Sequence, residues 1–192
     1  IEKTVNHDVK AVEMFINSKL TIWGQESLIP FVHFGRTSED INNVAYALML
    51  KGARDNVLLP ALRKLASNLG EMAKSSADKP MLSRTHGQPA TPTTFGKEVA
   101  VFAHRMGTQL DNIASVPVLA KFNGATGTFG ADVVAYPEID WQDTMKVFIE
   151  TLGLEYNPLT TQIESHDWIA RLNNEFVLSG TIATDFCRDF WQ

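Results

Sequence analysis

TSEDINNVAYALMLKGARDNVLLPALRKLASNL, residues 37–69, is the stretch that decides the fold. Thr37 or Ser38 can cap a helix, because either hydroxyl can accept a hydrogen bond from the free N–H groups of a first turn. Glu39 and Asp40 suit the positive end of the helix dipole. The residues behind them repeat an apolar side chain at three- and four-residue steps: Ile41, Val44, Ala45, Leu48, Leu58, Leu62, Leu65 and Leu69. This spacing predicts a long helix that begins at Thr37 or Ser38.

Helical spacing also dominates the segments on either side of this stretch. Pro60 is expected to kink the long helix, because proline removes one backbone donor. One apolar face is predicted for the first segment (Val5, Val9, Val12, Phe15, Ile16, Leu20), one for residues 95–113, and one for the last segment (Ile169, Leu172, Phe176, Ile182, Phe186, Phe190). A short helix is expected around residues 141–152. Together these patterns predict an all-α fold, and apolar residues on more than one side of several helices suggest an oligomer.

The helical pattern stops between residues 78 and 92. Four turn-forming residues lie there, Pro80, Gly87, Pro89 and Pro92, so we expect an ordered loop rather than a regular element. A turn does not require the neighbouring Ser83-Arg84-Thr85-His86. Histidine can give or take a proton near neutral pH, so His86 is as readily explained by chemistry as by structure.

Three further polar segments are not explained by the periodic pattern. Asn6-His7-Asp8 stands near the start of the first helix, Thr37-Ser38 at the start of the second, and residues 160–167, which include Gln162, before the last. Each has a structural explanation as a turn or a helix cap. Thr37 and Ser38 also have a functional one, because hydroxyls at a helix N-terminus can bind a carboxylate or a phosphate.

Composition excludes several classes of function. The 192 residues carry a net charge of −5, without the basic surplus typical of nucleic-acid binding proteins. Cys187 is the single cysteine, which excludes an internal disulfide and a cysteine-cluster metal site and fits a reducing cytoplasm. No apolar run approaches the ~20 residues that a membrane helix needs. No signal-peptide pattern appears at the start. We therefore expect a cytoplasmic protein with no nucleic-acid or membrane partner.

The polar segments together resemble adenylosuccinate lyases, a family within the fumarase/aspartase/argininosuccinate lyase superfamily. The resemblance runs through residues 3–13, 33–43, 82–92, 123–125 and 157–164, in the family's order, and so covers essentially the whole chain. The most specific parts are the stretches Arg84-Thr85-His86-Gly87-Gln88-Pro89-Ala90 and Asn6-His7-Asp8-Val9-Lys10-Ala11, which are similar to the bacterial-type branch.

This resemblance implies a place for the chain in a larger fold. The expected fold is all-α and forms part of the long helical bundle of that superfamily, truncated at both ends. Residues 1–26 are expected to end an N-terminal helical domain, and residues 27–192 to begin the central helical-bundle domain. Members of the family are homotetramers whose active sites combine segments of three subunits.

The resemblance also implies a reaction. Such enzymes eliminate fumarate from adenylosuccinate to give AMP, and from the succinyl-carboxamide ribotide (SAICAR) to give AICAR, without a metal or another cofactor. His86 matches the family's general acid. The positions that match substrate-binding residues are Asn6, His7, Asp8, Thr37, Ser38 and Gln162.

Two departures from the family pattern stand out. Arg36 occupies a position where members commonly carry a small residue. The loop Gly-Ser-Ser-x-Met-Pro-x-Lys-x-Asn-Pro, which carries the family's catalytic serine, is absent, so the 192 residues alone are expected to be inactive. The alternatives are a sister lyase acting on argininosuccinate, aspartate or malate, and a non-catalytic helical scaffold. His86 and Gln162 argue against the scaffold, since a scaffold needs neither side chain.

Overall fold

The computed structural model describes residues 1–191, and most of them are helical. The strands in this part of the chain form two small two-stranded sheets, so the prediction of an all-α fold is confirmed. Contacts within the chain group it into two units. The first unit comprises Ile1–Leu50 and Pro117–His166, and the second comprises Lys51–Val116 and the chain from Asp167 on. The predicted domain boundary after residue 26 stays a prediction.

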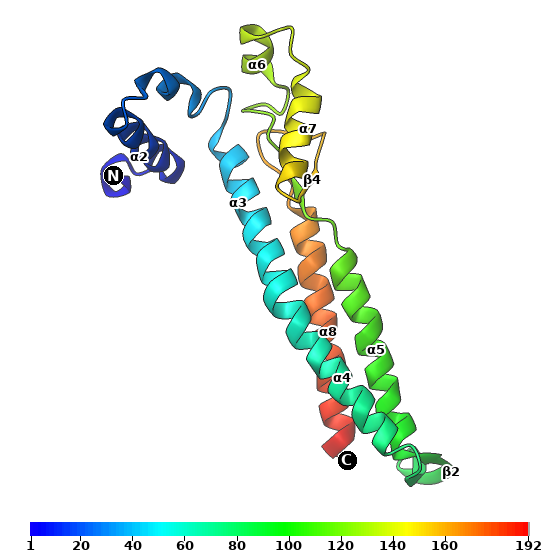
Figure 1. The fold of residues 1–192 in the computed structure, drawn as a ribbon. Coiled ribbons are helices and arrows are strands. Elements are labelled where there is room, and N and C mark those ends of the chain that lie inside the picture. Colours follow the sequence, from blue (N-terminus) through cyan, green and yellow to red (C-terminus); the bar gives the residue numbers. More distant parts are fainter. Residues whose placement is uncertain (192) are drawn as a thin grey trace. The chain divides into compact units, whose positions relative to one another are not determined.

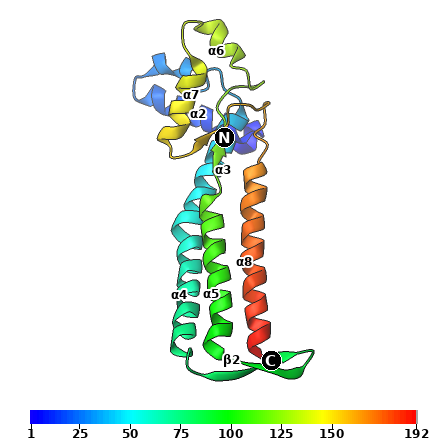
Figure 2. The ribbon, with the colours of Figure 1, turned by 90° about the vertical axis from the view of Figure 1, so that its right-hand side faces the viewer.

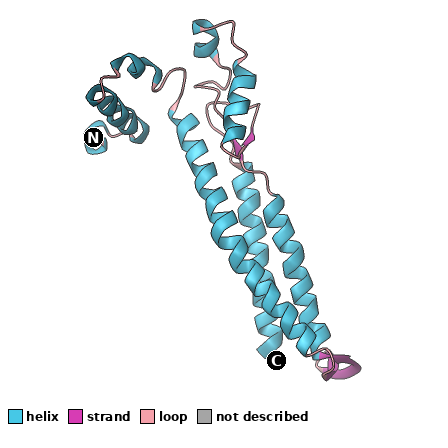
Figure 3. Cartoon of the chain, viewed as in Figure 1, coloured by secondary structure: helices cyan, strands magenta, loops and turns pink. Residues whose placement is uncertain are grey.

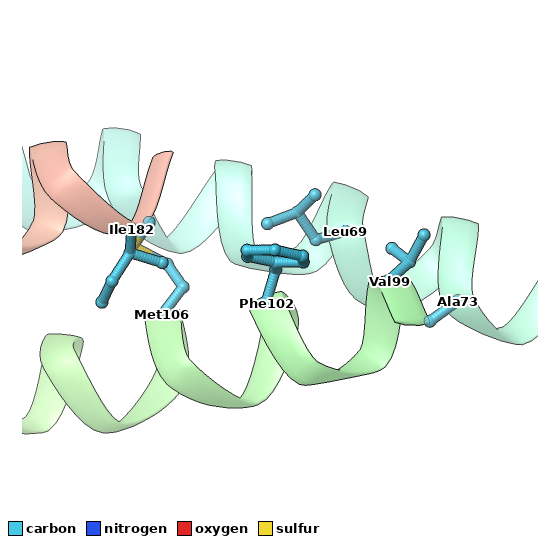
Figure 4. Packing of buried hydrophobic residues seen from close by; sticks show 6 residues of the cluster. All are labelled: Leu69, Ala73, Val99, Phe102, Met106 and Ile182. Atoms are coloured by element: carbon cyan, nitrogen blue, oxygen red, sulfur yellow. The ribbon is translucent and has the colours of Figure 1, made fainter. Parts of the chain in front are cut away.

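The second unit is a bundle of three long helices. These are α4 (Leu59–Ser75), α5 (Phe95–Ser115) and α8 (Asp167–Trp191), which lie side by side in both views of the ribbon (Figures 1 and 2). Their facing sides bury Leu69, Ala73, Val99, Phe102, Met106 and Ile182 (Figure 4). Removing such apolar surface from water is the main stabilising contribution to a bundle of this kind. The apolar spacing predicted for α5 and α8 therefore corresponds to a real core.

A β-hairpin connects α4 to α5, and here the prediction of an irregular loop for residues 78–92 is wrong. Strands β1 (Pro80–Thr85) and β2 (Gln88–Thr94) pair antiparallel, and they appear in magenta in Figure 3. Both strands are largely exposed, so they lack the apolar alternation by which a half-buried strand is recognised. Pro89 and Pro92 are tolerated because each strand of a two-stranded sheet is an edge strand.

The long helical stretch is interrupted before Pro60. Helix α3 (Ser38–Ala53) begins where the sequence predicts, and a π-helical turn, η2 (Arg54–Leu58), separates it from α4. Pro60 is the second residue of α4. A wider turn just ahead of proline makes room for a ring that cannot donate a backbone hydrogen bond. The interruption expected at Pro60 therefore takes the form of a π-turn one turn earlier.

The first unit contains shorter elements. They are α1 (Glu2–Val5), α2 (Asp8–Ile22), the 3₁₀ helix η1 (Glu26–Phe31), α6 (Gly130–Ala135), α7 (Trp141–Thr151) and a parallel pair of two-residue strands, β3 (Leu119–Ala120) and β4 (Glu155–Tyr156). The helix predicted at residues 141–152 is thus present as α7. Within residues 1–191, no helix is both long enough and apolar enough to cross a membrane.

The apolar face predicted for the first segment is only partly correct. Asn6 adopts a left-handed conformation, with φ of 50°, and ends α1, so Val5 does not continue into α2. Val9 is the buried residue of α2, whereas Val12 and Phe15 are about half exposed, at 53% and 52%. The apolar spacing identifies the helix correctly but not which of its residues are covered within one chain.

Candidate functional site

The N-terminus of α3 leaves two hydroxyls free for other partners. The hydroxyl cap expected there is not formed. Instead, the Asp40 carboxylate accepts the backbone N–H of Thr37, with 2.8 Å between N and Oδ2. An acidic residue three positions into a helix often satisfies the capping residue in this way. Among residues 1–191, the hydroxyls of Thr37 and Ser38 contact other side chains rather than the N–H groups of the first turn.

Both hydroxyls contact residues that are distant in the sequence. Gln162 Nε2 donates to Thr37 Oγ1 at 3.3 Å, and Ser38 Oγ lies 3.3 Å from His7 Nε2. His7 also caps α2, because its Nδ1 accepts the backbone N–H of Lys10 at 3.3 Å. In a neutral ring this leaves Nε2 as the protonated nitrogen, which donates to Ser38. Four of the predicted substrate-binding residues thus meet at the start of α3.

Asp8 is attached to the same helix through Asn42. Asn42 Nδ2 donates to Asp8 Oδ2 at 3.1 Å, while the backbone N–H of Val9 donates to Asp8 Oδ1 at 2.7 Å. The Val9 N–H, followed by the Asn42 amide, holds the pKa of the Asp8 carboxyl below its usual value. Asn6 differs from its neighbours, because its exposed side chain has no hydrogen bond among the described residues.

A buried ion pair fixes the first turn of α3. Lys121 Nζ lies 2.9 Å from Asp40 Oδ1, and both side chains are fully buried. Asp40 also accepts the backbone N–H groups of Asn123 and Gly124, each at 3.1 Å, and Lys121 Nζ donates to the Gly124 carbonyl at the same distance. Buried charges of this kind are stable only when paired and hydrogen-bonded. This cluster therefore clamps α3 to the loop that follows β3.

Two asparagine side chains add hydrogen bonds to this buried cluster. Asn43 pairs with the backbone of Lys121 in both directions, at 2.8 Å and 3.0 Å, and Asn123 Nδ2 donates to Thr160 Oγ1 at 2.8 Å. Sequence reasoning missed Asp40, Lys121 and both asparagines as parts of a network. One signal was present in the sequence. Lys121 lies between the apolar run of residues 116–120 and Phe122, and a lysine buried among apolar residues needs a partner for its charge.

Glu39 and Glu164 both face the ring of His166. Nε2 of His166 is 3.1 Å from Glu39 Oε1, and Nδ1 is 3.2 Å from Glu164 Oε2. Glu164 is fully buried, and Asn157 Nδ2 donates to its other oxygen at 2.8 Å. Glu39, like Asp40, therefore has a partner at the N-terminus of α3.

Arg36 does not add a free charge beside Thr37. Its guanidinium pairs with the buried carboxylate of Asp132, and it also donates to the carbonyl of Phe122. The same group lies 5.0 Å from the centre of the Phe122 ring, within the range of a cation–π contact. The departure from the family pattern at Arg36 thus serves the packing of the first unit.

His86 lies in the second unit, at the tip of the β1–β2 hairpin. Thr85 pairs with Gln88, so His86 and Gly87 are the two turn residues, with φ of 52° and 73°. Positive φ at both central positions is the mark of a type I′ turn. His86 is exposed and has no side-chain hydrogen bond within residues 1–191. The contacts described above involve His7, Asp8, Thr37, Ser38 and Gln162, which belong to the first unit. His86 therefore belongs to a different unit.

No group of three or more His, Cys, Asp or Glu side chains in the described part of the chain is arranged to hold a metal ion. The donors around the N-terminus of α3 are instead the hydroxyls of Thr37 and Ser38, the amide of Gln162 and the imidazole of His7. Such groups form hydrogen bonds to carboxylate and phosphate oxygens. The arrangement therefore suits an anionic organic ligand.

Comparison with known proteins places the chain in a family. The family model described as Lyase matches residues 1–192. The chain is 50% identical to the adenylosuccinate lyase of Escherichia coli strain K12 over 192 residues, and 50% identical to that of Vibrio cholerae over 193. It is 46% identical to the adenylosuccinate lyase of Haemophilus influenzae over 194 residues. In each case the match covers 100% of this chain and 42% of the relative, so the chain spans less than half the length of these curated relatives. A match over the whole chain shows that it belongs to the lyase family.

Proposed function

We propose that the full-length gene product is an adenylosuccinate lyase, which eliminates fumarate from adenylosuccinate to release AMP and acts on SAICAR in the same way. The observation that carries the proposal is the meeting of Thr37 and Ser38 with Gln162 and His7 at the start of α3. The relatives at 46–50% identity are named adenylosuccinate lyases, which supports the choice of substrate.

The charges around this site favour an anionic substrate. Adenylosuccinate carries two carboxylates and a phosphate, and the positive end of a helix dipole attracts such groups. Two acidic residues in the first turn of α3 would oppose this attraction if they were unpaired. Asp40 is paired with Lys121, however, and Glu39 with His166. Thr37 and Gln162 bond to each other, and Ser38 contacts His7. On binding, these groups would exchange those contacts for the substrate's oxygens, with Asn6, His7 and Asp8 completing the binding segment.

The proposed reaction is a β-elimination. A base takes a proton from the succinyl carbon next to a carboxylate, and the electron pair forms the C=C bond of fumarate. The C–N bond breaks, and His86 protonates the departing nucleotide nitrogen. Imidazole suits this step, since it can hold and release a proton near neutral pH. The exposed turn of the hairpin supports this role, because it leaves the ring of His86 without a competing partner.

The proposal extends to assembly and location. We propose a cytoplasmic homotetramer in which segments of different subunits combine to form each active site. Residues 1–26 would then end one helical domain, and residues 27–192 would begin the central bundle domain. Large apolar side chains left exposed on the second unit, such as Val57 and Val177 at 62% and 68%, support further assembly.

The test is fumarate release by the full-length gene product and its His86→Asn variant. Asparagine tolerates the left-handed conformation of residue 86, so the hairpin is kept while the proton donor is lost. We expect a fall in kcat of roughly 10²–10⁴-fold, the usual contribution of a general acid. His104→Asn is the matched control, because His104 is an exposed histidine of α5 and its side chain has no hydrogen bond among the described residues.

Two outcomes would overturn the assignment. Fumarate release from argininosuccinate, aspartate or malate, but not from adenylosuccinate, would indicate a sister lyase. No release from any of the four would favour a non-catalytic scaffold. An unchanged kcat in the His86→Asn variant would keep the reaction but remove His86 from the role of general acid.

A further inference from the structure

We propose that His166 is a positioning residue that holds Gln162 against Thr37 by joining Glu39 to Glu164. This inference rests on the proposed function, because it assigns His166 to the binding of the same substrate. The ring of His166 lies between two carboxylates that come from different segments, Glu39 of α3 and Glu164 of the loop of residues 157–166.

The two nitrogens of the His166 ring lie close to two different carboxylates. Nε2 lies within hydrogen-bonding distance of Glu39 Oε1, at 3.1 Å, and Nδ1 lies 3.2 Å from Glu164 Oε2, the same oxygen that accepts the backbone N–H of His166. Glu164 is fully buried, and His166 is the one basic side chain within 4.0 Å of it among residues 1–191. A buried carboxylate is strongly unfavourable unless polar partners surround it. The contact between Glu164 and His166 is therefore an integral part of the loop.

The loop that carries Gln162 has few apolar contacts of its own. Gln162 and Ile163 are exposed, the latter at 50%, and Leu159 is 89% exposed. Polar contacts hold it instead. Asn157 donates to Glu164 at 2.8 Å across the base of the loop, and Glu164 also accepts the backbone N–H of His166 at 2.7 Å. The position of the loop therefore depends on hydrogen bonds that converge on Glu164, together with the bond from Asn123 to Thr160.

The contact of Gln162 with Thr37 is too weak to hold this loop alone. It is a 3.3 Å bond between exposed side chains, and such a bond contributes little to stability. Glu39 lies in the first turn of α3, two residues after Thr37. A tether from His166 to Glu39 therefore fixes the loop next to the hydroxyl that Gln162 reaches. The backbone of His166 is itself in the left-handed region, with φ of 59°, which is unusual for a residue other than glycine.

The first experiment tests the tether without reference to catalysis. Hydrogen–deuterium exchange is measured on the full-length gene product, on its His166→Ala and His166→Asn variants, and on the matched control His104→Ala. Asparagine tolerates the left-handed backbone at residue 166, so His166→Asn separates loss of the ring contact from backbone strain. We expect faster exchange in residues 157–166 of both His166 variants, with α5 unchanged, and no such change in the control. Unaltered exchange in residues 157–166 would overturn the inference, whether or not the protein is a lyase.

The second experiment asks whether His166 acts through Gln162. We expect His166→Ala and Gln162→Ala each to raise KM for adenylosuccinate about tenfold with a smaller effect on kcat, and the double variant to lie within about twofold of the larger single effect. His166→Gln is expected to recover part of the loss, because its amide can still donate to Glu39. Effects that multiply in the double variant would contradict the inference, since His166 would then act independently of Gln162.

The two proposals fail in distinguishable ways. If the unmodified protein releases no fumarate, the proposed function fails, and the exchange experiment still decides whether His166 orders the loop. If the protein is active and His166→Ala changes neither KM nor exchange, the proposed function stands and the positioning role of His166 is wrong. A fall in thermal stability with an unchanged KM would also overturn it, because it would make His166 a purely structural residue.

Discussion

Gly96, the second residue of α5, lies where a side chain would collide with the end of α4. A Cβ at this position would stand 2.3 Å from the Ala73 carbonyl oxygen and 2.6 Å from the Ala77 nitrogen. Backbone atoms cannot move aside as a flexible side chain can. We therefore expect Gly96→Ala to lower the free energy of unfolding by at least ~1–3 kcal/mol, as overpacking does.

The matched control for this prediction is Gly107→Ala in the same helix. A Cβ at Gly107 meets nothing within 4 Å, so the change should stabilise α5 by about 0.5–1 kcal/mol through helix propensity alone. Midpoints of thermal unfolding, taken at one protein concentration, are the measurement. Shifts of the same sign and size in both variants would contradict the close approach at Gly96.

Asp8 provides a prediction of pH dependence. Its pKa is lowered first by the Val9 N–H and then by the Asn42 amide, so folding favours the charged carboxylate. The stabilisation is therefore complete above the ordinary pKa of the carboxyl and is lost as the pH falls through the lowered pKa. Asn42→Ala should raise the pKa of Asp8 towards its usual value while leaving the Val9 bond in place.

An NMR titration of the Asp8 carboxyl carbon measures this shift. Asn112→Ala serves as the control, because Asn112 bonds to Gln109 in the second unit and has no contact with Asp8. An unmoved or lowered pKa of Asp8 in Asn42→Ala would show that the amide does not contribute.

Lys121 and Asp40 show how one buried pair stabilises the start of α3. Lys121→Met removes the cation and leaves the fully buried Asp40 carboxylate with backbone donors only. Breaking a buried pair in this way typically costs about 3–5 kcal/mol. We expect a loss of that order in the free energy of unfolding, together with a higher KM, since Thr37 and Ser38 stand on the same turn.

Chemical denaturation with Lys146→Met as the control tests this prediction. Lys146 pairs with Glu150 at 4.0 Å on the surface of α7, where both side chains are 51% exposed, and such pairs are worth less than about 1 kcal/mol. Adding Asp40→Asn to Lys121→Met should recover part of the lost stability. Equal losses in Lys121→Met and Lys146→Met would show that burial does not strengthen the pair.

Elements with a sustained apolar spacing could be predicted from the sequence, and those without one could not. The spacing located α3, α5, α7 and α8, and the start of α3 at Ser38 agrees with the prediction. The hairpin was missed because its exposed strands show no alternation, although the two-residue turn His86-Gly87 was within reach of turn rules. The capping role of Asp40 was within reach of local rules, since it bonds to Thr37 three positions away, whereas its pairing with Lys121 depends on a distant segment.

The arrangement of the candidate site was predictable only as a set of residues. Asn6, His7, Asp8, Thr37, Ser38, Gln162 and His86 were selected one segment at a time. That Gln162 reaches Thr37 across 125 positions is a tertiary fact, which local periodicity does not contain. The linking residues Lys121, Asn123 and His166 were not selected, because each has an ordinary structural reading in isolation.

At the scale of the whole molecule, the exposed apolar side chains of the second unit predict an assembly. Val177 in the middle of α8 is 68% exposed, and its neighbour Leu178 is 44% exposed. If these residues are covered by other subunits, Val177→Lys should lower the molar mass of the full-length gene product, because burying an unpaired charge is costly.

Light scattering during size-exclusion chromatography reports that mass. Val134→Lys is the matched control, since Val134 is 86% exposed on the short helix α6. A tetramer that persists in Val177→Lys would show that this face of α8 remains in solvent.

The clamp between Asp40 and the loop after β3 has a consequence for biosynthesis. The carboxylate and the Asn123 N–H that it accepts are 83 positions apart. A ribosome that adds about 5–20 residues per second needs roughly 4–17 s to cover that interval. During this delay the nascent α3 carries a negative charge without its lysine, and the hydroxyls of Thr37 and Ser38 have no fixed orientation. The candidate site is therefore completed only after the loop that follows β3 has been made, although Thr37 and Ser38 are made well before that loop.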